Sequence, residues 1–95
     1  MSVYVDELFN TAGMSEKWRF KQSCHMPADT EAELHAMAAK LGLKREWCQY
    51  PDNPIRRHYD LTASKRALAL KHSAVPLTWR EMAQRTTSVL REGKD

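Results

Sequence analysis

The sequence predicts an α+β fold, a small mixed α/β domain in which a single sheet of three to five strands packs with about three helices. Two capping boxes mark helix starts, Thr30 with Glu33 and Thr78 with Glu81. Short stretches in which apolar and polar residues alternate, as they do in strands, lie outside the helices. The order of these signals predicts strands interleaved with helices in one domain.

Two strands are expected in the first part of the chain. The β-branched and aromatic stretch Val3–Leu8 predicts the first, with Val3 and Val5 on one face. The second is expected over Trp18–Met26, where apolar residues alternate with charged and polar ones. Cys24 falls on the apolar side of this strand and is therefore expected in the core.

The clearest helix is predicted over Thr30–Leu41. Leu34, Met37 and Ala38 recur there at the spacing of one helical face. Gly42 follows at the position where a helix commonly ends in a left-handed residue. We expect this helix to cover the sheet with its apolar face.

A third strand is predicted over Leu43–Tyr50, which carries Trp47 and Cys48. The turn residues of Pro51–Pro54 end it. An extended segment over Ile55–Leu61 then leads into the second helix.

The second helix is expected to begin after Thr62 as its N-cap. A brief extended segment over Ala74–Leu77 follows, and Pro76 would confine it to a sheet edge. The last helix begins at Thr78 and reaches about residue 90. The second helix is expected to bury a face of small residues: Ala63, Ala67, Leu70 and Ala74.

Length and composition bound the class of protein. Ninety-five residues predict one domain over 1–90 and a frayed tail over 91–95. No apolar run approaches the roughly 20 residues of a membrane span, and the first residues do not look like a signal peptide. The two cysteines form no disulfide framework, so we expect a cytoplasmic protein. The net charge of +3 permits an anionic partner without requiring one.

Four side chains that can move protons or bind a metal stand at the ends of predicted elements: Asp6, His25, His58 and Asp60. They converge only if the strands run in compatible directions. We identify His25, His58 and Asp60 as catalytic candidates for acid–base chemistry, and all four as candidate ligands of a divalent metal. The alternative is that Asp60 helps to cap the second helix and that His58 is an exposed loop residue.

A candidate anion site lies at the start of the second helix, formed by Thr62, Ser64, Lys65 and Arg66. Cations at a helix N-terminus oppose the helix dipole by about 0.3–1 kcal/mol unless a negative group compensates. A phosphate held by the helix N–H groups and the two cations would supply that compensation. The alternative is a solvated face on which Asp60 pairs with one of the cations.

Several motifs occur together in one order along the chain. They are Val3–Asp6, Cys24–Thr30 with Glu33–Ala38, Gly42 with Arg45, Trp47 and Gln49, and His58–Leu61 with Ser64–Arg66. This set resembles the small bacterial and phage family catalogued as domain of unknown function 4031, over roughly Val3–Val75.

The resemblance implies a stand-alone cytoplasmic protein of bacterial or phage origin, and it brings no activity with it. It marks six residues as standing in family motifs: His25, His35, His58, Asp60, Lys65 and Arg66. Ser73 departs from the family pattern, which tends to glycine at this position. Serine resists a positive φ, so we expect a local difference at the end of the second helix.

Three functions remain open from the sequence. The first is an acid–base or metal-dependent hydrolase acting on a phosphorylated small molecule. The second is a non-catalytic module that binds a nucleotide or the phosphates of a nucleic acid. The third is a bacterial or phage protein-interaction domain with structural histidines. The sequence leaves the oligomeric state open and indicates no membrane partner.

Overall fold

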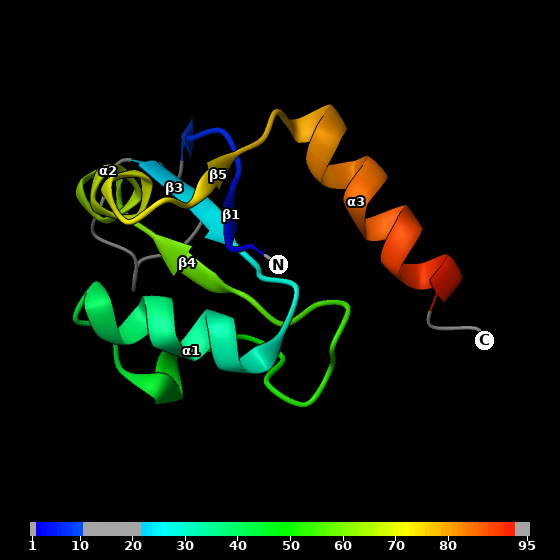
Figure 1. Cartoon of the computed structure of the whole chain (residues 1–95). Helices are drawn as coiled ribbons and strands as arrows, with labels where there is room; N and C mark the ends of the chain where they lie inside the picture. The colour runs from blue at the N-terminus through cyan, green and yellow to red at the C-terminus, as the bar shows by residue number, and fades with distance from the viewer. Residues whose placement is uncertain (1, 11–21, 93–95) are drawn as a thin grey trace.

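The computed structural model describes residues 2–10 and 22–92, and all of their side chains except those of residue 10 and residues 87–92. Within these residues the chain is mixed α/β with three α-helices, as predicted (Figure 1). The elements in chain order are β1 (Tyr4–Val5), β2 (Phe9–Asn10), β3 (Gln22–Met26), α1 (Glu31–Lys40), a 3₁₀ helix η1 (Arg45–Trp47), β4 (Tyr59–Leu61), α2 (Ala63–Lys71), β5 (Val75–Pro76) and α3 (Trp79–Glu92).

The strands form two small sheets, so the prediction of a single sheet is wrong. β3 is the middle strand of an antiparallel sheet in the order β2-β3-β4. β1 pairs in parallel with β5 in a separate two-stranded sheet. Residues 18–21 of the predicted second strand lie outside the described residues.

The first predicted strand, Val3–Leu8, is interrupted at Asp6. The carboxylate of Asp6 accepts the backbone N–H of His25 on β3, in place of a main-chain carbonyl. The carbonyl of Asp6 instead accepts a hydrogen bond from Arg66 Nε, at 2.8 Å. The regular ladder therefore breaks between β1 and β2, and the break places a carboxylate beside β3.

The core lies between one face of β3 and β4 and the helices α1 and α2. The alternation of a strand explains which residues enter it, because every second side chain points to the same face. Cys24 is buried, as predicted, and Val3 and Val5, which were predicted to share one face, are buried as well. The largest fully buried side chains are those of Tyr59, Met26, Leu34, Leu41 and Leu61.

Helix α1 forms as the sequence predicts. Thr30 is its N-cap and accepts the backbone N–H of Glu33, whose carboxylate accepts the Thr30 hydroxyl in return. Gly42 has a φ of 75° just beyond the C-terminus, in the left-handed region that favours glycine.

The prediction of a third strand over Leu43–Tyr50 is wrong. The segment contains η1, and only Gln49 makes a strand-like contact, as an isolated bridge to His58. Trp47 is 51% exposed, so its side chain does not enter the core. Among residues 43–50 only Cys48 is buried, which does not fit the two-residue repeat of a strand.

The predicted buried face of α2 is also wrong in part. Ala63 and Ala67 are exposed, whereas Ala69 is fully buried. The inward side of the first turns is occupied by Lys65 and Arg66, which reach backbone carbonyls of other elements. The first turns of the helix therefore direct Lys65 and Arg66 toward the body, while Ala63 and Ala67 face solvent.

The C-terminal elements confirm two predictions. β5 lies at a sheet edge. The N–H groups of Val75 and of Leu77, which follows β5, donate to the carbonyls of Val3 and Val5. Pro76 lies between these two donors, so its lack of an N–H group costs no hydrogen bond on this side. Thr78 and Glu81 form a reciprocal capping box at the start of α3.

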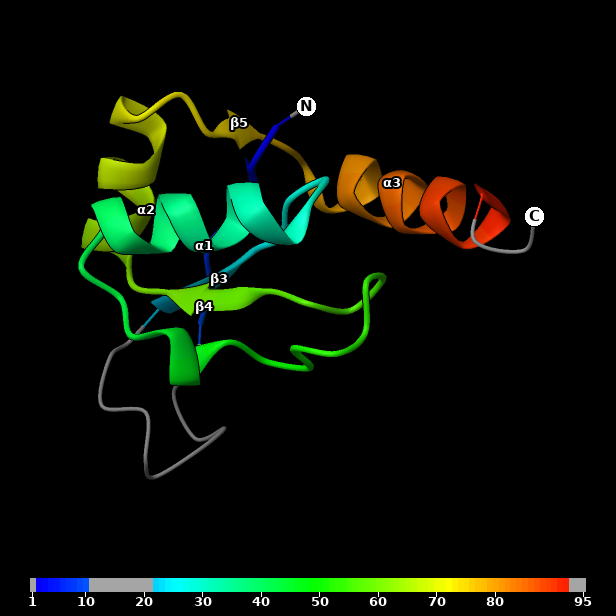
Figure 2. The same ribbon diagram turned by 60° about the horizontal axis from the view of Figure 1, so that its bottom comes forward.

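Helix α3 extends away from the rest of the molecule (Figures 1 and 2). It continues through Glu92, two residues into the segment predicted to fray, and residues 93–95 lie outside the described part. Within the described residues, no helix is long and apolar enough to cross a membrane.

Candidate functional site

Two histidines and a carboxylate lie together on the outer face of the β3–β4 pair. His25 and Asp60 are direct partners across the two strands. Their neighbours Cys24 and Leu61 point into the core, so alternation turns His25 and Asp60 outward. His58 stands two residues before Asp60 and therefore shares its face. Its ring centroid is 5.1 Å from that of His25.

Asp6 fixes the ring of His25. Its Oδ2 lies 2.8 Å from His25 Nδ1, while its Oδ1 accepts the His25 backbone N–H at 2.6 Å. Because a carboxylate accepts, His25 Nδ1 is the donor, and Nε2 is left available to a ligand. The hydrogen bond that the His25 ring donates to Asp6 raises the pKa of His25 above its ordinary value, against the opposing effect of burial. Phe9 stacks on the other side of the ring, with centroids 5.3 Å apart.

His58 is fixed in the same way by a backbone carbonyl. Its Nδ1 lies 2.6 Å from the carbonyl oxygen of Arg56, which can only accept, so this nitrogen donates. Nε2 of His58 then faces Asp60 Oδ1 at 3.4 Å. Both histidines thus use Nδ1 for orientation and keep Nε2 for chemistry.

The three side chains are of the types that bind metals and lie close enough together to hold an ion after a small adjustment. One ligand atom from each of His25, His58 and Asp60 lies within 4.8 Å of the other two. Ligands about 2.1 Å from a tetrahedral ion stand about 3.4 Å apart, which matches the His58–Asp60 separation. The widest separation would have to close by up to roughly 1.4 Å to reach that spacing. Two imidazoles and one carboxylate suit zinc and iron(II), with further coordination positions open.

Asp6 differs from the other three predicted metal ligands. It is only 4% exposed, and both of its oxygens are engaged by His25. It is therefore placed to orient a ligand rather than to be one, as carboxylates behind metal-bound histidines commonly do.

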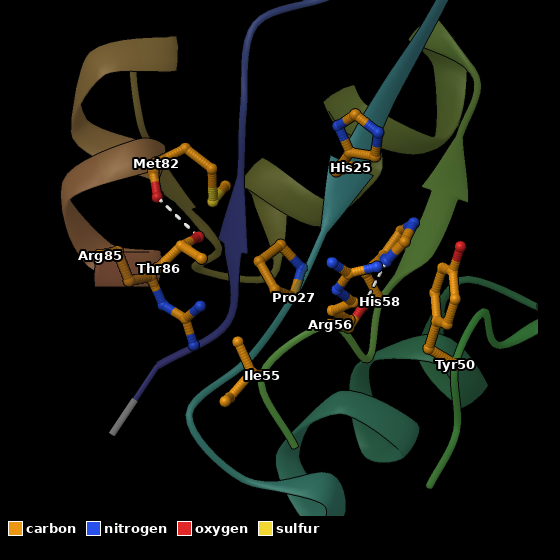
Figure 3. Close-up of a pocket in the computed structure, with 9 residues that line it drawn as sticks. All are labelled: His25, Pro27, Tyr50, Ile55, Arg56, His58, Met82, Arg85 and Thr86. Carbon is orange, nitrogen blue, oxygen red and sulfur yellow. Dashed lines mark hydrogen bonds between the residues drawn. The ribbon is translucent and has the colours of Figure 1, made fainter. Parts of the chain in front are cut away.

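A cavity of about 270 Å³ opens beside the two histidines (Figure 3). In the figure, Tyr50, Arg56 and His58 lie on one side, Arg85 and Thr86 of α3 on the other, and Pro27 between them. Ile55 and Met82 complete an apolar part of the lining. A small molecule in this cavity would contact His25 and His58 directly.

The predicted anion-binding residues do not line this cavity. Thr62 is the N-cap of α2 and accepts the backbone N–H of Lys65, while Ser64 is exposed. Lys65 Nζ donates to the carbonyl of Leu41 at 2.6 Å, at the C-terminus of α1, where a cation is favoured by the helix dipole. Arg66 likewise donates to a backbone carbonyl, that of Asp6, so protein groups compensate both cations.

His35 and Cys24 lie apart from the cluster. His35 Nδ1 is 2.8 Å from the hydroxyl of buried Tyr59, and its Nε2 is 3.6 Å from Glu31. Cys24 is fully buried, and burial raises the pKa of its thiol to about 12, so it is a core residue and not a nucleophile.

Sequence reasoning missed the residues that complete the site around the cluster, namely Phe9, Tyr50, Met82 and Arg85. Phe9 lies just beyond the first predicted strand, and Tyr50 ends the third predicted strand, which does not form. Met82 follows the capping box of α3 by one residue, but nothing in that helix indicates that it lines the same cavity as His25. The isolated bridge of Gln49 with His58, which brings Tyr50 to the cavity, also has no local signature.

Fold and cluster together define a small mixed α/β protein with a two-histidine, one-carboxylate group on the outer face of its central strands. The model of the family described as "Protein of unknown function (DUF4031)" matches residues 3–89, and the chain belongs to this family. The resemblance inferred from the sequence motifs is thereby confirmed. No curated protein and no solved structure matches the chain.

Proposed function

We propose that this protein is a divalent-metal-dependent hydrolase acting on a phosphorylated substrate, with His25, His58 and Asp60 as the metal ligands. One observation carries the proposal. The Nδ1 atom of each histidine is engaged by an acceptor, Asp6 for His25 and the Arg56 carbonyl for His58. Such outer partners fix the tautomer and orientation of metal-binding imidazoles.

A metal at this position would supply the chemistry of hydrolysis. Three protein ligands leave positions for water and substrate, and a bound divalent ion lowers the pKa of its water toward 7. In such a hydrolysis a water oxygen would form a bond to phosphorus while the ester P–O bond breaks. One proton of the water would pass to the leaving alcohol, and the other would remain on the phosphate. A divalent ion there would be offset by the carboxylates of Asp60 and Asp6, and the guanidinium of Arg56 at the same cavity adds the positive charge that favours an anionic substrate.

Asp6 is a positioning residue in this proposal. Its buried carboxylate accepts hydrogen bonds from both the backbone N–H and the ring of His25, so the imidazole is held in one orientation with Nε2 available to a metal. A cytoplasmic location in a bacterium or phage-infected cell is part of the proposal, and the free thiols of Cys24 and Cys48 support a reducing compartment.

The Asp6–His25 pair also supports a second candidate, in which His25 acts as a general acid or base without a metal. A histidine oriented by a carboxylate is the usual arrangement for such a role. The two candidates differ in one measurable property, because only the metal-dependent enzyme loses activity on chelation.

The test titrates the metal-free protein with Zn²⁺, Co²⁺ and Mn²⁺ by calorimetry and assays phosphomonoester hydrolysis with and without chelator. We expect one ion per chain, with affinity lost in His58→Ala and Asp60→Asn. His72→Ala is the matched control, because His72 is exposed at the C-cap of α2, outside the cluster. Stoichiometric binding that survives both cluster variants would contradict the proposed ligands. Activity that persists in chelator would instead favour the metal-free candidate.

A further inference from the structure

We propose that the cavity beside His25 and His58 is the substrate site and takes a small phosphomonoester, with Arg56 binding the phosphate. This inference rests on the proposed function, because the histidines at one end of the cavity are the proposed metal ligands. It goes further by naming the residues that select the substrate. None of them belongs to the anion site predicted from the sequence.

The size of the cavity limits the ligand. Its volume of about 270 Å³ lies just below the usual range of roughly 300–1,000 Å³ for small-molecule sites. This space accommodates a phosphate and about one ring or a short alkyl group. A phosphate placed against His25 and His58 would bring its ester bond to the proposed metal.

Arg56 is the cation available to an anion in the cavity. Among the residues that the structure describes, no carboxylate forms an ion pair with Arg56, whereas Arg85 across the cavity lies 3.5 Å from Asp29. The Arg56 guanidinium lies 5.8 Å from the centre of the Tyr50 ring, which it contacts as a cation over an aromatic face. Its carbonyl accepts the hydrogen bond from His58, so its backbone is tied to the site.

Tyr50 supplies an aromatic wall at an energetic cost to its own backbone. Its φ of 50° lies in the left-handed region that residues with a Cβ adopt with strain. Its side chain is nevertheless 55% exposed, with the ring centroid 6.3 Å from that of His58. A strained and exposed aromatic residue at a cavity rim is typical of a residue that contacts a ligand.

An apolar part of the lining would receive the leaving group. Pro27, Ile55 and Met82 come from three separate segments and present carbon and sulfur atoms to the cavity. We therefore expect an apolar or aromatic leaving group to be preferred over a small or charged one. Met82 belongs to α3, so this helix contributes to specificity although it extends from the body.

The experiment uses the Zn²⁺-loaded protein, after its metal content has been measured. Inorganic phosphate is titrated by calorimetry, and phenyl phosphate and methyl phosphate are compared as substrates. Arg56→Gln should weaken phosphate binding by about tenfold or more and raise KM while metal binding stays unchanged. The matched control, Arg80→Gln, removes an exposed arginine of α3 that does not line the cavity. Met82→Ala should reduce the preference for phenyl over methyl phosphate several-fold.

The outcomes separate the two proposals. If the wild-type protein binds no metal, the proposed function is wrong and the cavity assignment falls with it. If metal binds but Arg56→Gln binds phosphate as the wild type does, only the cavity assignment is wrong. The binding of a 5′-phosphorylated single-stranded oligonucleotide is measured as the last comparison. Tighter binding of this probe than of phenyl phosphate, with a steep loss as salt rises, would overturn the small-molecule substrate.

Discussion

Asp6 holds His25 with both carboxylate oxygens, one on the backbone N–H at 2.6 Å and one on the ring Nδ1 at 2.8 Å. The first contact replaces a rung of the β-ladder, and the second orients the imidazole. The irregularity that divides the strands into two sheets is thus also what brings a buried carboxylate to the site. Fold and site depend on the same side chain.

Asp6→Asn should weaken metal binding by about 10–100-fold, the usual effect of losing a carboxylate behind a metal-bound histidine. The amide keeps the size of the side chain but removes its charge and one of its acceptor groups. Asp29→Asn is the control, since Asp29 also accepts a backbone N–H, that of Ser2, but lies outside the cluster. Calorimetric titration of both variants with Zn²⁺ measures the effect. Equal affinities in the two variants would contradict the positioning role of Asp6.

The pKa of His25 predicts how stability depends on pH. This pKa is raised in the folded state by the hydrogen bond that His25 donates to Asp6, so the folded protein holds the proton more tightly than the unfolded chain. The resulting stabilisation is complete below the unfolded value near 6.5 and is lost as pH rises through the folded pKa.

We therefore expect the metal-free wild type to exceed Asp6→Asn in unfolding free energy by more at about pH 5.5 than at about pH 8.5. Urea denaturation at several pH values measures this difference. Metal binding should follow the opposite trend, since protonated His25 cannot coordinate an ion. A stability difference that grows with pH would show that the pair is not formed as described.

Lys65 is predicted to contribute stability rather than anion binding. Its ammonium donates to the Leu41 carbonyl at 2.6 Å, joining the start of α2 to the end of α1. Lys65→Met keeps the stem of the side chain but loses this bond, and it should lower the unfolding free energy by about 1–2 kcal/mol. Phosphate affinity should remain that of the wild type, in contrast to Arg56→Gln. If Lys65→Met instead bound phosphate weakly and kept the stability of the wild type, the anion site would lie at the start of α2.

The sequence predicts what depends on local pattern. The capping boxes of α1 and α3 and the edge position of Pro76 follow from residues a few positions apart, and all are confirmed. His25 also lies on the polar side of its strand, as alternation indicates.

The sequence does not predict what depends on distant partners. The burial of Cys48 without its neighbours and the turning of Lys65 and Arg66 toward carbonyls are set by elements far away in the chain. The position of Met82 and Arg85 at the cavity beside His25 has the same origin. Tertiary contacts of this kind decide which face of a helix is buried, and they leave no periodic signal.

Ser73 provides a prediction about backbone strain. It has a φ of 74° just after α2, where its N–H donates to the carbonyl of Leu70. The serine at this position therefore keeps the positive φ that glycine would adopt without strain. Ser73→Gly should raise the unfolding free energy by about 1 kcal/mol, because it removes the clash of Cβ with the following carbonyl.

Ser73→Ala is the control, since it removes the hydroxyl but keeps Cβ, and it should leave stability nearly unchanged. Thermal and urea unfolding of the three proteins measure the difference. A loss of stability in Ser73→Gly would mean that the greater freedom of the unfolded chain outweighs the relief of strain.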